Sequence, residues 1–172
     1  MREEWVLRAQ QGDKKAFDKI AREWYPKILN YVYRATLNME LASEITQITM
    51  VQSYFKLQQL REPRYFATWI YKIATNLIFD HLRDKRRESL TLDDIVEPSF
   101  TPNWETKLAI QQALNQLSDK ERTVVVMKIY ENMKFREIAE VLDEPESTIK
   151  TRLYNGLKKL RQILDGWGMK EV

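Results

Sequence analysis

One short stretch of the sequence gathers the side-chain types that read nucleic acid. From Glu146 to Arg161, apolar residues recur every three or four positions and are expected to face inward, with hydroxyl, amide and cationic side chains between them; the apolar residues are Ile149, Leu153, Leu157 and Leu160. Near the start of a helix, such side chains form hydrogen bonds with base edges in the major groove of DNA. We therefore predict DNA contacts by Thr148, Lys150, Thr151, Arg152, Tyr154, Asn155 and Lys158. The alternative is an amphipathic helix whose charges are merely solvated or complement the helix dipole.

A second basic surface is predicted in the first half of the chain. Its residues are spaced by three or four, which places them on one helix face. They are Lys72, Asn76, Phe79 and Arg83, and they lead into Arg86 and Arg87. The opposite face is expected in the core and consists of Ile70, Ile73, Ala74, Leu77 and His81.

Catalytic and metal-binding signatures are missing from the sequence. It has no glycine-rich phosphate loop, no Gly-x-Ser-x-Gly elbow and no His-Glu-x-x-His motif. The absence of cysteine excludes disulfides and thiolate metal sites, and the single histidine, His81, is expected at the edge of the core. We therefore predict a protein that is not an enzyme and that uses no metal or cofactor.

The elements that must position these residues are predicted to be helices. Only four glycines occur in 172 residues, which disfavours tight hairpins and favours an all-α fold. Hydrophobic periodicity predicts helices over about 3–10, 13–36, 40–57 and 66–86. Further helices are predicted over 108–117, from Ser118 onward, over 135–142, and from Glu146 onward.

The helices are expected to form two small domains. Residues 89–104 contain Pro98 and Pro102 with little periodicity, and they are predicted to be a flexible linker. It would join a helical domain over 1–88 to a second over 105–165, with a tail over 166–172. Within the second domain, residues 134–161 predict two helices joined by a short turn, the second one basic, which is the helix-turn-helix pattern.

Composition places the chain among ordinary globular proteins. Charged residues make up 31% and apolar ones 44%, and no stretch of 18 apolar residues could cross a membrane. The N-terminus lacks the apolar segment of a signal peptide, so we predict a cytoplasmic protein without membrane insertion of its own. A net charge of +3 does not by itself indicate a nucleic-acid partner, because many proteins of this size are mildly basic. The clustering of the cations is the stronger indication.

The helix-turn-helix segment resembles a known family. Residues 144–161 resemble the recognition helix of the extracytoplasmic-function (ECF) group of bacterial sigma factors, with its pattern Pro-x-Gly-Thr-Val-Lys-Ser-Arg. Ser147 stands where that family usually has glycine, and Asn155 where arginine is frequent. The resemblance implies contacts to the promoter's minus-thirty-five element by Lys150, Thr151, Tyr154 and Asn155, among the seven residues given above.

The run from Tyr65 to Arg87 is similar to the same family's signature Phe-x-x-Trp-Leu-Tyr-Arg-Ile-Ala-x-Asn. The resemblance implies that residues 59–87 melt and hold the minus-ten element. Melting needs a pocket for an unstacked base and cations along the displaced strand. The residues expected to provide these contacts are Arg64, Tyr65, Lys72, Asn76, Arg83, Arg86 and Arg87. Trp69, at helical spacing, is expected to be structural.

Residues 42–51 resemble the family's polymerase-docking helix, within a docking segment over 40–57. Periodicity predicts that Leu41, Ile45, Ile48 and Phe55 face the core. The outward, polymerase-binding residues are then expected to be Glu44, Gln47, Met50 and Tyr54.

The resemblance covers nearly the whole chain and implies a transcription initiation factor. Such a factor binds core RNA polymerase, recognises the minus-ten and minus-thirty-five elements of promoter DNA and promotes melting, and an anti-sigma factor is an expected partner. One alternative is a helix-turn-helix transcriptional regulator that acts without replacing a sigma subunit. A response-regulator activator of that kind is disfavoured because residues 1–88 lack strand-like alternation. The second alternative is a helical adaptor that binds only protein and no nucleic acid.

Overall fold

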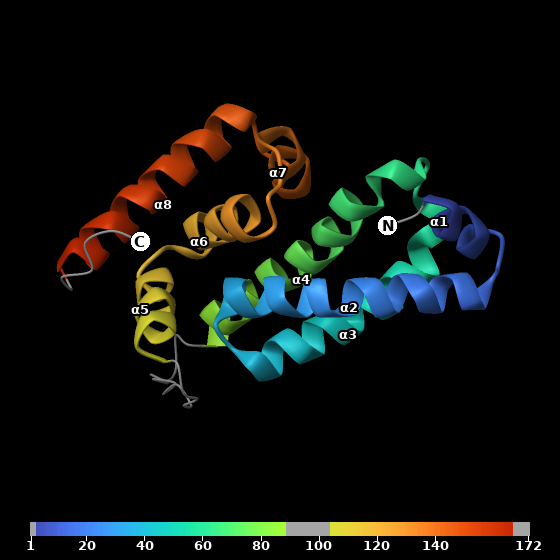
Figure 1. Ribbon diagram of the computed structural model, residues 1–172, viewed down its shortest axis with the longest axis horizontal. Helices are drawn as coiled ribbons and strands as arrows, with labels where there is room; N and C mark the ends of the chain where they lie inside the picture. The colour runs from blue at the N-terminus through green and yellow to red at the C-terminus, as the bar shows by residue number, and fades with distance from the viewer. Residues whose placement is uncertain (1–2, 89–103, 167–172) are drawn as a thin grey trace.

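The computed structural model of the protein describes residues 3–88 and 104–166, with side chains over 3–85 and 109–166. The N-terminal unit contains α1 (Glu3–Gln10), α2 (Lys14–Thr36), α3 (Met39–Lys56) and α4 (Phe66–Glu88). The C-terminal unit contains α5 (Trp104–Asn115), α6 (Asp119–Val125), α7 (Phe135–Leu142) and α8 (Glu146–Gly166), with a π-helical turn over Val126–Tyr130 (Figure 1). Over the described residues the fold is helical without strands, so the predicted all-α class is confirmed. The predicted linker, except Trp104, and the tail, except Gly166, lie outside this range.

Local capping explains where several helices begin. Asp13 and Asn38 each accept a hydrogen bond from a backbone amide three residues on, those of Ala16 and Leu41. Ser118 and Glu121 cap the start of α6 reciprocally. These side chains satisfy donors that the first helical turn leaves without partners. The helix limits predicted from sequence are therefore close to the observed ones.

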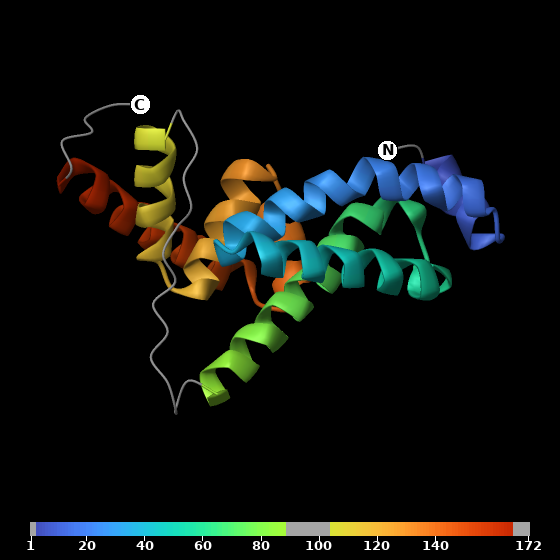
Figure 2. The ribbon, with the colours of Figure 1, turned by 90° about the horizontal axis from the view of Figure 1, so that it is seen from below.

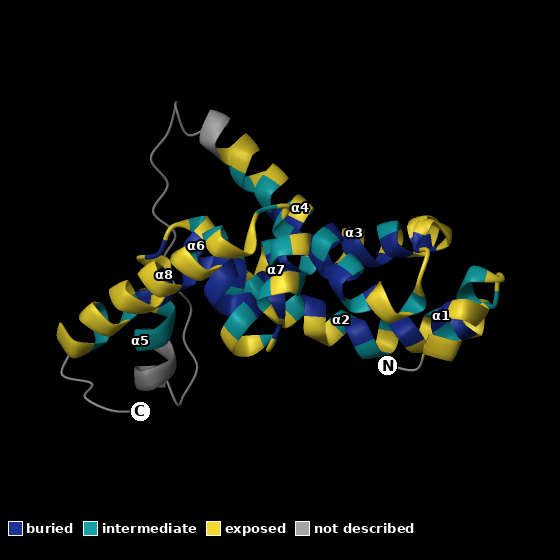
Figure 3. Cartoon of the chain, turned by 90° about the horizontal axis from the view of Figure 1, so that it is seen from above, coloured by how far each residue is buried: buried dark blue, intermediate teal, exposed yellow. Residues whose placement is uncertain are grey.

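The core of the N-terminal unit lies between α2, α3 and α4. Tyr31, Phe66 and Ile70 are fully buried there, and the Tyr31 hydroxyl is 2.8 Å from Thr75 Oγ1. Burial raises the pKa of Tyr31 well above its ordinary value. His81 is exposed, contrary to prediction, because α4 extends beyond the bundle at that point and Ile78 is the last fully buried residue of its apolar face (Figure 3).

In the C-terminal unit, α6 and α8 pack closely at Gly156. A Cβ atom at this position would lie 3.0 Å from Cγ2 of Val125, so a side chain here would crowd a buried neighbour. Gly156 therefore occupies the inward position that periodicity assigned to Leu157, which is 40% exposed. Ile149 and Leu153 are buried as predicted.

The two units pack against each other. α4 contacts α7, and α2 contacts both α6 and the π-helical turn (Figure 2). Arg122 is buried at this interface, and its Nε donates to the backbone oxygen of Ala35 at 2.6 Å. Its other contacts, at 2.7 Å with Asp119 and 3.4 Å with the Leu114 oxygen, lie within its own unit. The interface is therefore both apolar and specifically hydrogen-bonded.

Candidate nucleic-acid and polymerase interfaces

The first half of α8 presents one exposed polar face. Asp143, in the left-handed conformation, ends α7, and α8 begins after Pro145, so the chain changes direction between the two helices. The exposed residues here are Lys150, Thr151, Tyr154, Asn155 and Lys158, with Thr148 half-buried beside them. Five of the seven predicted DNA contacts are thus brought together on one accessible surface (Figure 3).

Arg152 departs from the predicted outer face. Its side chain is only 17% exposed, and its Nη1 lies 2.6 Å from Oε2 of Glu144. The other oxygen of this carboxylate, Oε1, accepts a hydrogen bond from Nζ of Lys120 at 3.0 Å. Burial would raise the pKa of Glu144, but the hydrogen bond from Lys120 and the positive charges of Lys120 and Arg152 outweigh it and hold that pKa below its ordinary value. Arg152 therefore ties α8 to the turn before it, and the expectation that it lies outward is wrong.

A second ion pair fixes α8 from the other side. Lys159 Nζ lies 2.8 and 2.9 Å from the two carboxylate oxygens of Glu121. Between this pair and the Glu144 pair, a shallow groove of about 620 Å³ separates the start of α6 from the exposed face of α8. Ser118 and Lys120 line its far wall, which sequence reasoning did not assign to the site.

The second predicted basic face is only partly described. Asn76 and Arg83 are exposed on α4, Lys72 is half-buried, and Arg83 Nη2 is 2.5 Å from Asp80 Oδ1. Phe79, expected on this face, packs partly against the core. Trp69, expected to be structural, also packs partly against the core. The side chains of Arg86 and Arg87 lie outside the described residues.

The loop that precedes α4, residues 57–65, presents aromatic and charged groups. Arg64 and Tyr65 are exposed, the Arg64 guanidinium lies 4.9 Å over the Tyr65 ring, and its Nη2 is 2.5 Å from Glu62. Leu57 and Leu60 are buried and anchor the loop from below. The Nε2 of Gln10 donates to both of their backbone oxygens, at 3.0 and 2.7 Å. No local sequence signal connects Gln10 to this loop.

The outward face of α3 differs from prediction. Met50 is 9% exposed and part of the core, whereas Phe55 is 76% exposed and Val51 is 56% exposed. The buried side of α3 instead carries hydroxyls that bond to carbonyls of the preceding turn: Thr46 to Ala42 at 2.6 Å, Thr49 to Ile45 at 2.7 Å and Ser53 to Met50 at 2.8 Å. Glu44, Gln47 and Tyr54 are exposed as predicted, and Ile48 is exposed against prediction.

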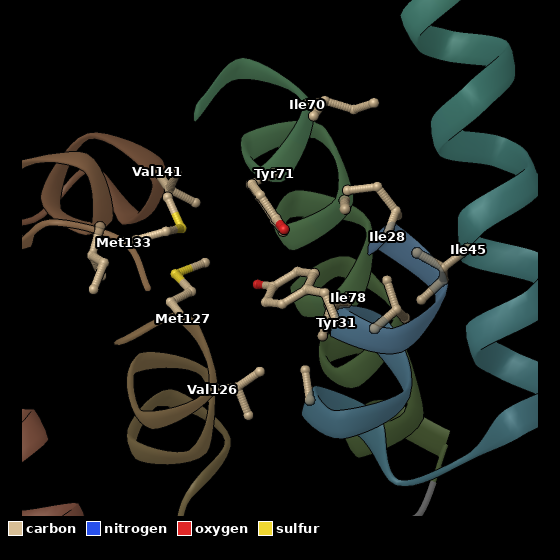
Figure 4. Close-up of a cluster of buried hydrophobic side chains, with 14 of the residues drawn as sticks. Ile28, Tyr31, Ile45, Ile70, Tyr71, Ile78, Val126, Met127, Met133 and Val141 are labelled. Atoms are coloured by element: carbon tan, nitrogen blue, oxygen red, sulfur yellow. The ribbon is translucent and has the colours of Figure 1, made fainter. Parts of the chain in front are cut away.

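A polar cluster, which we call the interdomain cluster, joins the two units through Arg34, Tyr71, Tyr130 and Glu131. The Tyr71 hydroxyl donates to Oε2 of Glu131 at 2.5 Å, and Arg34 Nη1 lies 3.6 Å from Oε1 of the same carboxylate. The Arg34 guanidinium is 4.5 Å from the Tyr130 ring centre. Burial, together with the bond to Glu131, raises the pKa of Tyr71 well above its ordinary value. On the inner side of the cluster, Met127 and Met133 face Tyr31 and Tyr71 (Figure 4).

Among the described residues, no group of three acidic, histidine or cysteine side chains could hold a metal ion. In the same part of the chain, no helix is both long and apolar enough to span a membrane.

Comparison with known proteins matches both units. The family model described as Sigma-70 region 2 matches residues 20–88, and that described as Sigma-70 region 4 matches residues 107–160. The chain is 32% identical to the ECF RNA polymerase sigma factor SigW of Bacillus subtilis, over 92% of this chain and 94% of that protein. It is 26% identical to the RNA polymerase sigma-H factor of Pseudomonas aeruginosa, over 92% and 91%.

Two solved structures share the fold. CnrH, in complex with the cytosolic domain of CnrY, has a TM-score of 0.75 and 20% identity over 95% of this chain and 97% of that one. RpoE, in complex with the anti-sigma factor NepR from Bartonella quintana, has a TM-score of 0.78 and 18% identity over 88% and 98%. At these identities the likeness concerns the fold.

Proposed function

The chain belongs to the ECF group of the sigma-70 family and is a transcription initiation factor, and we propose which of its surfaces binds each partner. The exposed face of α3 docks on core RNA polymerase. The loop over 57–65 and α4 hold the opened minus-ten element, and α8 reads the minus-thirty-five element. The phosphoryl chemistry belongs to polymerase, and the factor itself is not an enzyme. The factor acts in the cytoplasm, where polymerase works.

The exposed face of α8 supports this division most directly. Lys150, Thr151 and Asn155 offer a cation, a hydroxyl and an amide within two helical turns, and none of them is buried. These groups suit phosphates and base edges in a major groove. Because Glu144 and Glu121 hold α8 in place through Arg152 and Lys159, the reading face is presented on a fixed support.

An anti-sigma factor is the further partner that we propose. The solved relatives CnrH and RpoE were captured with CnrY and with the anti-sigma factor NepR, respectively. The same fold here offers the exposed apolar residues of α3, such as Phe55, as a surface that an inhibitor could cover.

Run-off transcription with core polymerase tests the proposed function. Core polymerase without any sigma factor should start at promoter sequences selected from a library only when this protein is added. A regulator that acts beside another sigma subunit would stay inactive with core polymerase and would require a holoenzyme. Failure to start at any template with core polymerase would exclude the proposal.

The packing of the two units has a geometric consequence for this function. α4 packs on α7 and α7 packs on α8, which at 8–10 Å for each pair of packed helix axes gives roughly 16–20 Å between α4 and α8. Each of these two helices is roughly 30–35 Å long, so the two reading faces lie within about 55 Å of each other. Elements named minus-ten and minus-thirty-five are separated by roughly 85 Å of duplex, at 3.4 Å per base pair. The closed arrangement therefore cannot read both at once, and the units must separate on polymerase.

The interdomain cluster sets part of the cost of that separation. We expect Glu131→Lys to open the molecule, because it places a cation against Arg34 and removes the acceptor of Tyr71. A larger open fraction should raise the apparent affinity for core polymerase about 3- to 10-fold. Since the chain has no cysteine, spin labels on cysteines placed at exposed Asn30 and Gln162 can report the distance between the units.

Charge reversal provides the control. Adding Arg34→Glu to Glu131→Lys restores an ion pair of opposite sense and should return both the label distance and the polymerase affinity toward the wild-type values. Glu140→Lys, on an exposed position of α7, changes the net charge equally and should leave both unchanged. An unaltered distance distribution in Glu131→Lys would show that the cluster does not hold the units closed.

A further inference from the structure

The end of α1 is attached to the loop that precedes α4. Gln10 is the last residue of α1, and both hydrogens of its amide are used, one toward the Leu57 oxygen at 3.0 Å and one toward the Leu60 oxygen at 2.7 Å. These residues lie 47 and 50 positions away in the sequence. α1 packs on both short helical turns of the loop, Leu57–Gln59 and Pro63–Tyr65 (Figure 1).

The two carbonyls flank the short helical turn Leu57–Gln59 that follows α3, and a glutamine amide is well suited to hold them. Carbonyl oxygens at a helix end lack partners inside the helix and are satisfied by side chains or water. The Leu57 oxygen also accepts the Leu60 amide at 3.2 Å, so Gln10 joins a tight turn that is already formed. A half-buried donor that reaches two carbonyls restrains the path of the backbone more than an apolar contact does.

Directly beyond this attachment the loop presents its functional groups. Leu60 is buried, and exposed Arg61, Arg64 and Tyr65 follow within five residues. An unstacked base needs an aromatic face and a cation at a fixed distance from the helix that holds the neighbouring phosphates. The direction in which residues 61–65 leave Leu60 decides where these groups lie, and Gln10 fixes that direction at the Leu60 carbonyl.

We propose that Gln10 is a positioning residue for promoter opening, which holds the loop over 57–65 in the conformation that captures an unstacked minus-ten base. This rests on the proposed function of the loop. Gln10 lies outside residues 20–88, the part of the chain that matches Sigma-70 region 2, so α1 adds a contact from beyond that region. Gln10 acts through the backbone of Leu57 and Leu60 and does not itself touch DNA.

Two variants of Gln10 test the proposal in the holoenzyme assembled with core polymerase. Gln10→Leu removes the donors, and Gln10→Glu keeps the shape but places carboxylate oxygens against the two carbonyls. With 2-aminopurine in the minus-ten element, we expect the opening rate to fall about 10-fold in Gln10→Leu and further in Gln10→Glu, as for lost pre-organisation. Gln11→Leu, at the exposed neighbour, should open the promoter at the wild-type rate.

Three further measurements separate positioning from stability. Affinity for core polymerase, binding to a duplex that carries only the minus-thirty-five element, and the melting temperature should stay within about twofold or a few degrees of wild type. Binding of the holoenzyme to a single-stranded minus-ten oligonucleotide should weaken together with opening. Equal opening rates in wild type and Gln10→Leu would overturn the role of Gln10. So would a loss of opening that is matched by losses in polymerase affinity, minus-thirty-five binding and melting temperature. A wild-type holoenzyme that opens no promoter would instead overturn the proposed function itself.

Discussion

Affinity for core polymerase is expected to fall at least about 100-fold when Val51 and Phe55 are both replaced by glutamate. Their side chains are 56% and 76% exposed on α3, and an interface that buries them gains roughly 1.5–3 kcal/mol for each. The variant loses this binding free energy and must also desolvate two carboxylates. The sum exceeds about 2.7 kcal/mol, the binding free energy that corresponds to a 100-fold change in affinity. A competition assay against a labelled sigma factor for core polymerase measures the loss.

A matched substitution on the other unit controls for charge and exposure. Ile129 is 56% exposed, the same as Val51, but it lies on the π-helical turn of the C-terminal unit. Ile129→Glu should therefore bind core polymerase within about threefold of wild type. Because Val51 and Phe55 face water, their replacement should leave the melting temperature nearly unchanged. If the double variant kept its affinity for core polymerase, the proposal that α3 is the docking face would be excluded.

Helix α3 shows why the sequence predicted the limits of helices better than it predicted which side of a helix is buried. Predicted helix limits are accurate because caps such as Asn38 are local signals that operate over three or four residues. The outward face of α3 was predicted only in part, since Met50 is buried and Phe55 faces outward. Thr46, Thr49 and Ser53 satisfy their hydroxyls within the helix and can therefore be buried in place of apolar residues. Periodicity counts apolar residues and does not register this satisfaction.

Tertiary partners account for the other differences. Arg152 looked like a DNA contact because its residue type and position fit, but Glu144, eight residues earlier, holds it. The contacts of Gln10 with the loop and of Glu131 with Tyr71 join segments 47 to 60 residues apart, and neither has a local signature. The face of α8 could be predicted because all of its residues belong to one helix, so 3.6-residue periodicity alone places them together.

That face carries the other large expected effect: replacing both Lys150 and Asn155 with alanine should weaken minus-thirty-five binding by the holoenzyme about 100-fold. A good base contact is worth roughly 1–3 kcal/mol, and a lysine–phosphate contact adds a salt-dependent share, so the slope of log K against log salt should flatten by about 0.9. Arg161→Ala with Gln162→Ala likewise removes one cation and one amide, from the far end of α8, where both side chains are exposed, and should change binding only a few-fold. Fluorescence anisotropy with promoter and scrambled duplexes over a salt series measures both quantities. The reading face lies near the start of α8 only if the first pair loses discrimination between the duplexes and the second pair keeps it.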